Sequence, residues 1–457
     1  MTTFNAPAVA PTPEPTLARR IGVFDATMLV MGGIVGAGIF VNPSVVAQIV
    51  SRPALILGAW LIGGLIAMFG AFIFAEIAAR QPQVGGQYAY LRDAFHPLVA
   101  FLLGWTSLLV VQSGGMAAVA ITFARYFQQV VPTGLPDAAV AVLAVATLVA
   151  VNCLGVGAGN RVQSVLMVTK IGAIAVLVVC GFLFVDARPL QFVPVVDTPL
   201  SFDLLTVLGA TMVPVLFSYG GWQTSSFASA ELTHPTRDLP RALLWGVTGV
   251  VILYVAVSYV CLRALGPEGL ARTTTPATDV MSLALGEPGR RFIALGIAVS
   301  TLGFLSQGIL TAPRLYYAMA RDGLFFRKVG ELHPSRRVPV TAILCQGLLT
   351  TVVALSGRYD QILNYVVSVD WIFFGLTAAT LFVFRRRGDA QGDVVSSRAP
   401  GHPWTTAAFV LVSWLVVANT VYRYPSNALI GVAILVAGLP AYWLWRRDGV
   451  SRPSPAS

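Results

Sequence analysis

Long apolar segments recur along this chain of 457 residues, and they limit what it can fold into. A helix needs about 20 mostly apolar residues to cross the roughly 30 Å hydrocarbon core of a bilayer. Hydrophobic residues make up 56% of the chain and charged residues 11%, against about 45–50% and about 25% in soluble domains. Segments of the required length occur at 22–48, 54–79, 97–129, 137–156, 160–185, 203–230, 241–264, 291–320, 338–356, 361–384, 404–422 and 426–446. The sequence therefore predicts an all-α polytopic membrane protein with twelve transmembrane helices.

An even number of crossings places both chain ends on the same side of the membrane. Residues 1–20 are polar, rich in proline and without an apolar segment of the signal-peptide type, so we expect a disordered tail there and a second tail at 447–457. Lysine and arginine are concentrated in these tails and in the loops on their side, which marks the cytoplasmic side of the inner membrane. The net charge of +10 then indicates topology and contact with anionic lipid, and not nucleic-acid binding.

The first apolar segment carries glycines at its centre, in "GGIVGAGIF" from Gly32 to Phe40. Glycine costs about 1 kcal/mol relative to alanine inside a helix, and open backbone in a bilayer is tolerated only where it is buried in protein or lines a wet cavity. Close helix packing through Gly32 and Gly36 is one explanation. A phosphate-binding loop is excluded, because the strand and soluble βαβ context that it needs are missing.

A second interruption occurs five segments later, in "VPVLFSYGGWQTSSFASAEL", where Pro214, Gly220 and Gly221 stand among hydroxyl side chains. Segments an odd number of crossings apart run in opposite directions, so these two could be related by an axis in the membrane plane. Paired interruptions of this kind point to a binding site at the midplane of a transporter. Free N–H groups at such breaks attract an anion and free carbonyls attract a cation, which suits a zwitterionic amino acid.

The motifs "GGIVGAGIF", "GGQYAYLRDAFHPLVAFLLGW", "FSYGGWQTSSFASAEL", "HPTRDLPRAL" and "TAPRLYYAMARDG" together resemble the amino acid-polyamine-organocation superfamily. The sequence is similar in particular to bacterial permeases of the L-type amino acid transporter kind. The resemblance implies a five-plus-five inverted-repeat (LeuT-type) fold with helices 1 and 6 broken. The repeats would cover 21–185 and 186–387, with two further spans in 388–446.

The same resemblance implies a substrate site at the two breaks. Gly36, Ala37 and Gly38 would present N–H groups to the substrate carboxylate, and the segment from Phe217 to Gly220 would offer carbonyls to its ammonium group, with Phe217 as an aromatic gate. The full expected set is Ile34, Val35, Gly36, Ala37, Gly38, Phe217, Ser218, Tyr219 and Gly220. Family members often have serine where Ala37 stands, so one hydroxyl contact is absent here. The segment "QQVVPTGLPD" has no cysteine, so we expect no covalent heavy-chain partner.

Ionisable residues inside apolar segments are costly and are functional candidates for that reason. Lys170 lies deep in the fifth segment, and two roles stay open for it: a structural cation on the carbonyls of the broken first helix, or an amine that titrates or replaces a sodium ion. We expect a hydrogen-bonded structural carboxylate at Asp370, with proton relay as the alternative. Glu76 and Glu231 are expected to pair with loop arginines such as Arg237 or Arg241.

These observations predict a secondary active transporter of amino acids that works by alternating access. The apolar Ile34, Val35 and Phe217, together with the scarcity of intramembrane carboxylates, favour neutral substrates over a polyamine or another amine. A membrane-embedded enzyme or a channel is disfavoured, because the segments carry neither a nucleophile with its base nor repeated rings of charge. No cofactor and no metal site are expected, since all four histidines lie in loops.

Overall fold

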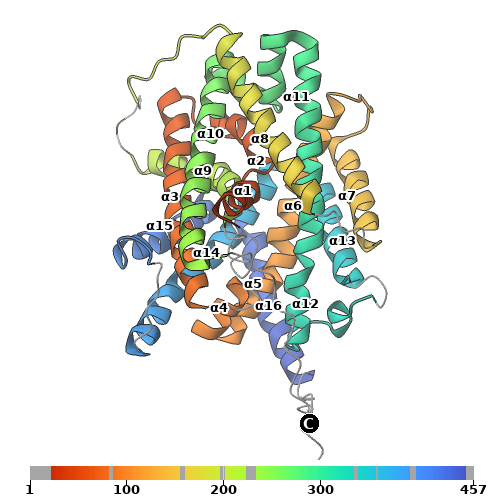
Figure 1. Ribbon diagram of the computed structural model, residues 1–457, viewed down its shortest axis with the longest axis vertical. Helices are drawn as coiled ribbons and strands as arrows, with labels where there is room; N and C mark the ends of the chain where they lie inside the picture. The colour runs from red at the N-terminus through yellow and green to blue at the C-terminus, as the bar shows by residue number, and fades with distance from the viewer. Residues whose placement is uncertain are drawn as a thin grey trace, which may run out of the picture.

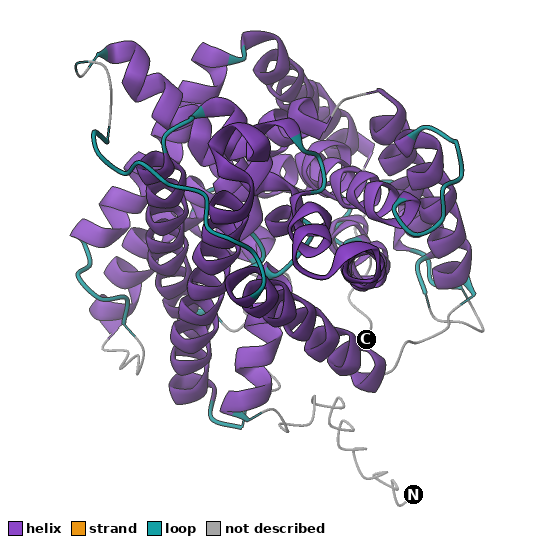
Figure 2. Cartoon of the chain, turned by 90° about the horizontal axis from the view of Figure 1, so that it is seen from above, coloured by secondary structure: helices purple, strands orange, loops and turns teal. Residues whose placement is uncertain are grey.

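The computed structural model describes residues 22–81, 86–154, 160–195, 199, 201–222, 233–333, 338–356, 359–391 and 398–448. Within these ranges every regular element is a helix, which confirms the all-α prediction. Most helices run along the long axis of the molecule (Figure 1), and Figure 2 shows them end-on from above.

The α-helices make up most of the described chain. In chain order they are α1 (Val23–Ile34), α2 (Gly38–Ile49), α3 (Pro53–Arg80), α4 (Gln87–Ala94), α5 (Pro97–Thr106), α6 (Gln112–Gln128), α7 (Asp137–Cys153), α8 (Asn160–Leu183), α9 (Phe202–Tyr219), α10 (Pro235–Arg272), α11 (Pro276–Thr311), α12 (Pro313–Arg321), α13 (Val340–Ser356), α14 (Tyr359–Gln391), α15 (Trp404–Arg423) and α16 (Pro425–Asp448). A π-helical turn, Ser107–Val111, joins α5 to α6, and a 3-10 turn, Arg327–Gly330, follows α12.

Seven helical stretches in the described part of the chain are long and apolar enough to cross a membrane. They are Pro53–Arg80, Pro97–Gln128, Phe202–Tyr219, Arg237–Arg272, Tyr359–Gly388, Trp404–Arg423 and Pro425–Trp445. The pair α1 and α2 passes the same test together, with a bend of 45° between the two helices. Shorter apolar helices occupy Asp137–Cys153, Thr169–Leu183 and Val340–Ser356. The chain is therefore a multi-pass membrane protein, with helix present in every segment where the sequence predicted a span.

Helix fills most of residues 265–290, the stretch between the predicted segments 241–264 and 291–320. The α10 helix continues to Arg272 across a kink at Gly266, and α11 begins at Pro276 and is kinked at Gly286. Both glycines have positive φ, 70° and 66°, a conformation that side chains with a Cβ rarely adopt. These helical stretches lie outside the predicted apolar segments, so a count of apolar residues cannot locate them. The short helix α4 was missed for the same reason.

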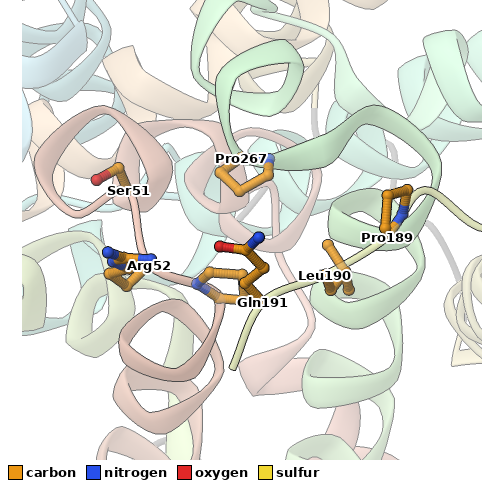
Figure 3. Close-up of a pocket in the computed structure, with 7 residues that line it drawn as sticks. Ser51, Arg52, Pro189, Leu190, Gln191 and Pro267 are labelled. Atoms are coloured by element: carbon orange, nitrogen blue, oxygen red, sulfur yellow. The ribbon is translucent and has the colours of Figure 1, made fainter. Parts of the chain in front are cut away.

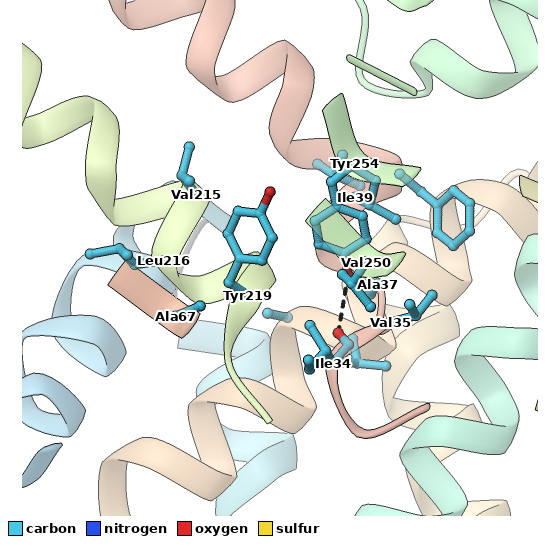
Figure 4. Close-up of a cluster of buried hydrophobic side chains, with 14 of the residues drawn as sticks. Ile34, Val35, Ala37, Ile39, Ala67, Val215, Leu216, Tyr219, Val250 and Tyr254 are labelled. Carbon is cyan, nitrogen blue, oxygen red and sulfur yellow. Dashed lines mark hydrogen bonds between the residues drawn. The ribbon is translucent and has the colours of Figure 1, made fainter. Parts of the chain in front are cut away.

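Small residues on α3 let two other helices approach its backbone. A Cβ on Gly63 would lie 2.3 Å from Val215 of α9, and one on Gly64 would lie 2.5 Å from Val251 of α10. Such contacts are how helices pack in membranes, where the hydrophobic effect does not drive them together. The approach brings Trp60, Tyr219 and Tyr254 into mutual contact, with ring centroids 5.1 to 5.9 Å apart. Figure 4 shows Tyr219 and Tyr254 of this cluster beside the end of α1.

Glu76 anchors one end of the helix bundle, and its partners differ from those predicted. Its fully buried carboxylate accepts bonds from Nε and Nη2 of Arg385 on α14, at 2.9 and 2.7 Å, and from Nε of Arg80 at 2.8 Å. The backbone N–H of Ala399 donates to the same carboxylate at 2.6 Å. The predicted pairing of Glu76 with arginines is therefore confirmed, but its partners are Arg385 and Arg80 and not the named examples, Arg237 and Arg241. Glu231 lies outside the described residues.

Candidate functional site

The first break separates α1 from α2 at Val35, Gly36 and Ala37. The N–H of Val35 still bonds to the carbonyl of Met31, but the helical backbone pattern stops there and resumes at Gly38. A helix that ends leaves its last carbonyls, and one that begins leaves its first N–H groups, without intrahelical partners. No side chain of the described residues caps the start of α2. The break therefore presents free N–H groups inside the bundle.

Side chains from two other helices satisfy the carbonyls that the break exposes. Nζ of Lys170 on α8 donates a hydrogen bond to the carbonyl oxygen of Val35. The hydroxyl of Tyr254 on α10 lies 3.1 Å from the carbonyl oxygen of Ile34, and the dashed line in Figure 4 marks this contact. The end of α1 is thus held open by specific donors, and the packing of small residues alone does not explain it.

The second break begins where α9 ends at Tyr219. Gly220 has φ −60° and ψ 154°, and Gly221 has φ +111°, which turns the chain out of the helix. A Cβ on Gly221 would lie 1.9 Å from the carbonyl oxygen of Gly33, so the two breaks touch backbone to backbone. The hydroxyl of Tyr254 also lies 3.2 Å from the carbonyl oxygen of Ser218 and so spans both breaks. Residues 223–230, which would complete the predicted sixth span, lie outside the described residues.

The helices α2 and α9 pack closely on one side of the two breaks. A Cβ on Gly38 would lie 2.6 Å from Oγ of Ser218 and 2.9 Å from its Cα. The fully buried amide of Asn42 donates to the carbonyl of Pro214 and to Oγ of Ser218, both at 2.8 Å. The hydroxyl of Tyr359 on α14 donates to Oδ1 of Asn42 at 3.1 Å. This polar network joins α2, α9 and α14 beside the breaks.

The nine predicted substrate-binding residues all lie at these two breaks, but their exposure differs. Gly36, Phe217 and Gly220 are partly exposed. The others are buried, namely Ile34, Val35, Ala37, Gly38, Ser218 and Tyr219. The hydroxyl of Tyr219 donates to the carbonyl of Trp60 at 3.0 Å, so that side chain points toward α3. The surface available to a ligand at the breaks is thus largely backbone, with one aromatic side chain.

Lys170 lies at the first break, as its depth in the sequence predicted. Its side chain is buried, with 6% of the residue exposed, and the ring centroid of Phe304 on α11 lies 5.4 Å from Nζ. Asp370 on α14 is partly buried and makes no hydrogen bond or ion pair with the residues that the structure describes. That finding does not support the expected hydrogen-bonded structural carboxylate.

Sequence reasoning missed three side chains that shape the site: Asn42, Tyr254 and Phe304. A fully buried asparagine within an apolar segment was a usable signal, because an amide there needs partners. Tyr254 and Phe304 gave no such signal, since aromatic residues are common in apolar helices. Their roles depend on which face of α10 and of α11 lies against the first break.

A cavity of about 340 Å³ lies apart from the breaks, near the start of α3. Its lining comes from the α2–α3 turn, the segment after α8 and the kink in α10: Ser51, Arg52, Pro53, Pro189, Leu190, Gln191 and Pro267 (Figure 3). None of the predicted site residues lines it. The described residues also contain no cluster of histidine, cysteine and acidic side chains that could hold a metal ion.

These features define a class: a multi-pass helical membrane protein whose backbone is opened at two touching breaks within the bundle. The chain belongs to the amino acid permease family, since the family described as "Amino acid permease" matches residues 21–441. This match confirms the family that the sequence motifs suggested. The family consists of transporters and not enzymes.

Several characterised transporters are similar over nearly the whole chain. "Large neutral amino acids transporter small subunit 2" of Mus musculus is 28% identical over 437 residues, covering 94% of this chain and 81% of that protein. "Serine/threonine exchanger SteT" of Bacillus subtilis (strain 168) is 28% identical over 431 residues, covering 93% and 97%. "b(0,+)-type amino acid transporter 1" of Mus musculus is 28% identical over 443 residues, covering 94% and 88%.

Proposed function

We propose that this protein is a secondary active transporter of neutral L-amino acids, and that the substrate binds between the two breaks. Two contacts that bring the breaks together carry the proposal. Gly221, just past the end of α9, meets the Gly33 carbonyl near the end of α1, and Gly38 at the uncapped start of α2 packs against Ser218 of α9. Two members of the similar group are named for large neutral amino acids and for serine and threonine, which supports neutral substrates.

The substrate's two charges match the two helix ends. Its carboxylate would accept bonds from the N–H groups of Gly36, Ala37 and Gly38 at the positive end of α2. Its ammonium group would bind carbonyls at the end of α9, between Phe217 and Gly220. The partly exposed ring of Phe217 would then cover the bound amino acid. No cofactor or metal takes part in this scheme, and no covalent heavy chain is needed.

The fold that we propose around this site has two inverted repeats, 21–185 and 186–387, followed by two spans in 388–446. Movement of one repeat against the other would expose the site alternately to the two sides of the membrane. In this scheme the hydrogen bond between Tyr359 and Asn42 would help to close the α2 side. With both tails cytoplasmic, that side is the external one.

Lys170 would serve this transporter as a fixed substitute for a coupling ion. Its ammonium group binds the Val35 carbonyl that the break exposes, and carbonyls of this kind are ligands for sodium in transporters with broken helices. Transport should therefore not need sodium.

We expect saturable, stereoselective exchange when the purified protein is placed in liposomes loaded with a mixture of neutral L-amino acids. Uptake of labelled L-leucine or L-serine should be inhibited by excess L-isomer, but not by the D-isomer or by putrescine. It should persist when choline replaces sodium at constant pH and ionic strength. A flux that rises linearly with concentration would indicate a channel instead, and inhibition by putrescine would indicate an amine carrier.

The proposed orientation predicts which engineered cysteines react from outside the cell. In a background with the four native cysteines replaced, Ser282→Cys on the exposed arm of α11 should react with an impermeant maleimide in intact cells. Ser454→Cys should react only after the membrane is permeabilised. Labelling of Ser454→Cys in intact cells, with Ser282→Cys protected, would show that the orientation is reversed.

A further inference from the structure

Three elements that are far apart in the sequence meet at the first break. Val35 ends α1, Lys170 comes from α8, and Phe304 comes from α11. Nζ of Lys170 donates to the Val35 carbonyl and also lies 5.4 Å from the ring centroid of Phe304. The same ring lies against the break itself, because a Cβ on Gly36 would be 3.6 Å from Cζ of Phe304. One aromatic ring thus contacts both the lysine and the glycine of the proposed carboxylate site.

The ammonium group of Lys170 has few other groups to stabilise it. It has three N–H donors, and its hydrogen bond to Val35 is with a neutral acceptor. No carboxylate pairs with it among the residues that the structure describes, although burial makes an isolated charge costly. The negative face of an aromatic ring attracts a cation, most strongly where water is excluded. Phe304 provides that face.

We propose that Phe304 is a positioning residue for transport, which holds the Lys170 ammonium group against the Val35 carbonyl and links it to the substrate at Gly36. The inference rests on the proposed function, because it assigns Phe304 a part in the step that Lys170 controls. A substrate carboxylate at Gly36 contacts the ring edge, and the ring face contacts the amine. Occupancy of the site is therefore transmitted to the amine through Phe304.

Simple packing is the competing explanation, since Phe304 is partly buried against the main core. A double-mutant comparison separates the two, because residues that act through each other are non-additive whereas independent residues add. Exchange rates should be measured in liposomes for the native protein, Phe304→Leu, Lys170→Met and the double variant. Phe123→Leu is a matched control, because Phe123 stacks on Phe127 at 5.3 Å and no cation from the described part of the chain lies over its ring.

We expect Phe304→Leu to slow exchange about tenfold in the native background, as the loss of a desolvated cation–π contact implies. In the Lys170→Met background the same substitution should change the rate by less than about twofold. Replacing Phe304 by 3,5-difluorophenylalanine, which weakens the ring's negative face with little change of shape, should give an intermediate rate. Phe123→Leu should leave the exchange rate of the folded protein unchanged.

An equal effect of Phe304→Leu in both backgrounds would overturn the inference, and so would a native rate for the fluorinated protein. A Lys170→Met variant that exchanges at the native rate would also overturn it, since Phe304 would then have nothing to act through. In each of these cases the native protein still exchanges amino acids, so the proposed function stands. Failure of the native protein to transport would instead reject the proposed function.

Discussion

Replacing Gly221 by alanine should abolish substrate binding and lower transport by at least about 100-fold. The added Cβ would lie 1.9 Å from the carbonyl oxygen of Gly33 and 2.7 Å from its carbon, and both are backbone atoms that no side-chain rotation can move. The φ of +111° adds backbone strain of about 1–3 kcal/mol for any residue with a side chain. The two breaks would have to separate, and the site that they form together would be lost.

The neighbouring glycine provides the control for this prediction. Gly220 has φ −60°, and a Cβ there would meet its nearest atom, the carbonyl oxygen of Phe217, at 3.3 Å. Gly220→Ala needs only a small local shift and keeps the backbone carbonyls that we propose to bind the ammonium group, so it should bind substrate far better than Gly221→Ala. Both variants should be tested for yield, thermal unfolding and binding of L-leucine, so that misfolding is distinguished from a lost site. Native binding by a folded Gly221→Ala variant would contradict the contact between the breaks.

Replacing Glu76 by glutamine should destabilise the protein by about 3–5 kcal/mol, the usual cost of removing one partner from a buried ion pair. Glu76 is fully buried and accepts two bonds from Arg385, whose side chain is only 16% exposed. The amide cannot neutralise that guanidinium group, and its NH₂ would face the donors of Arg80 and Ala399. We therefore expect the midpoint of thermal unfolding of the purified Glu76→Gln protein to fall by a large amount.

An exposed ion pair provides the comparison for Glu76. Glu287 accepts bonds from Arg290 at 3.1 Å and Arg291 at 2.8 Å, with about half of its side chain exposed. Exposed pairs contribute about 0–1 kcal/mol, so Glu287→Gln should barely change the midpoint. Similar small shifts for both variants would mean that Arg385 and Glu76 do not hold α14 to α3.

The features that depend on one segment at a time were predictable from the sequence. Apolar length located the helices that fill the apolar segments, but not α4 or the helical parts of 265–290. The cost of glycine in a helix located both breaks, at Gly36 and at Gly220 and Gly221. The depth of Lys170 in its segment was sufficient to place it at the level of the first break. Each of these predictions uses only the rise and the hydrogen-bond pattern of a single helix.

Partnerships between helices were not predictable in the same way. Glu76 pairs with Arg385, 309 positions away, because of how α14 lies across the end of α3. Asn42 meets Ser218, and Phe304 meets Lys170, for the same kind of reason. A single sequence specifies which face of a helix is polar only where polar residues are frequent. In these segments nearly every face of each helix is apolar. The sequence therefore did not determine which face each helix turns toward its neighbours.

The phenol group of Tyr254 has only one hydrogen, yet it lies within bonding distance of two carbonyls, those of Ile34 and Ser218. It can therefore donate fully to one of them at a time. If the two halves of the protein part, the hydroxyl can stay with either carbonyl, and the number of bonds that it donates does not change. The Tyr254 hydroxyl thus joins the two breaks, yet it keeps one hydrogen bond after they separate. This keeps the energetic barrier to their separation low.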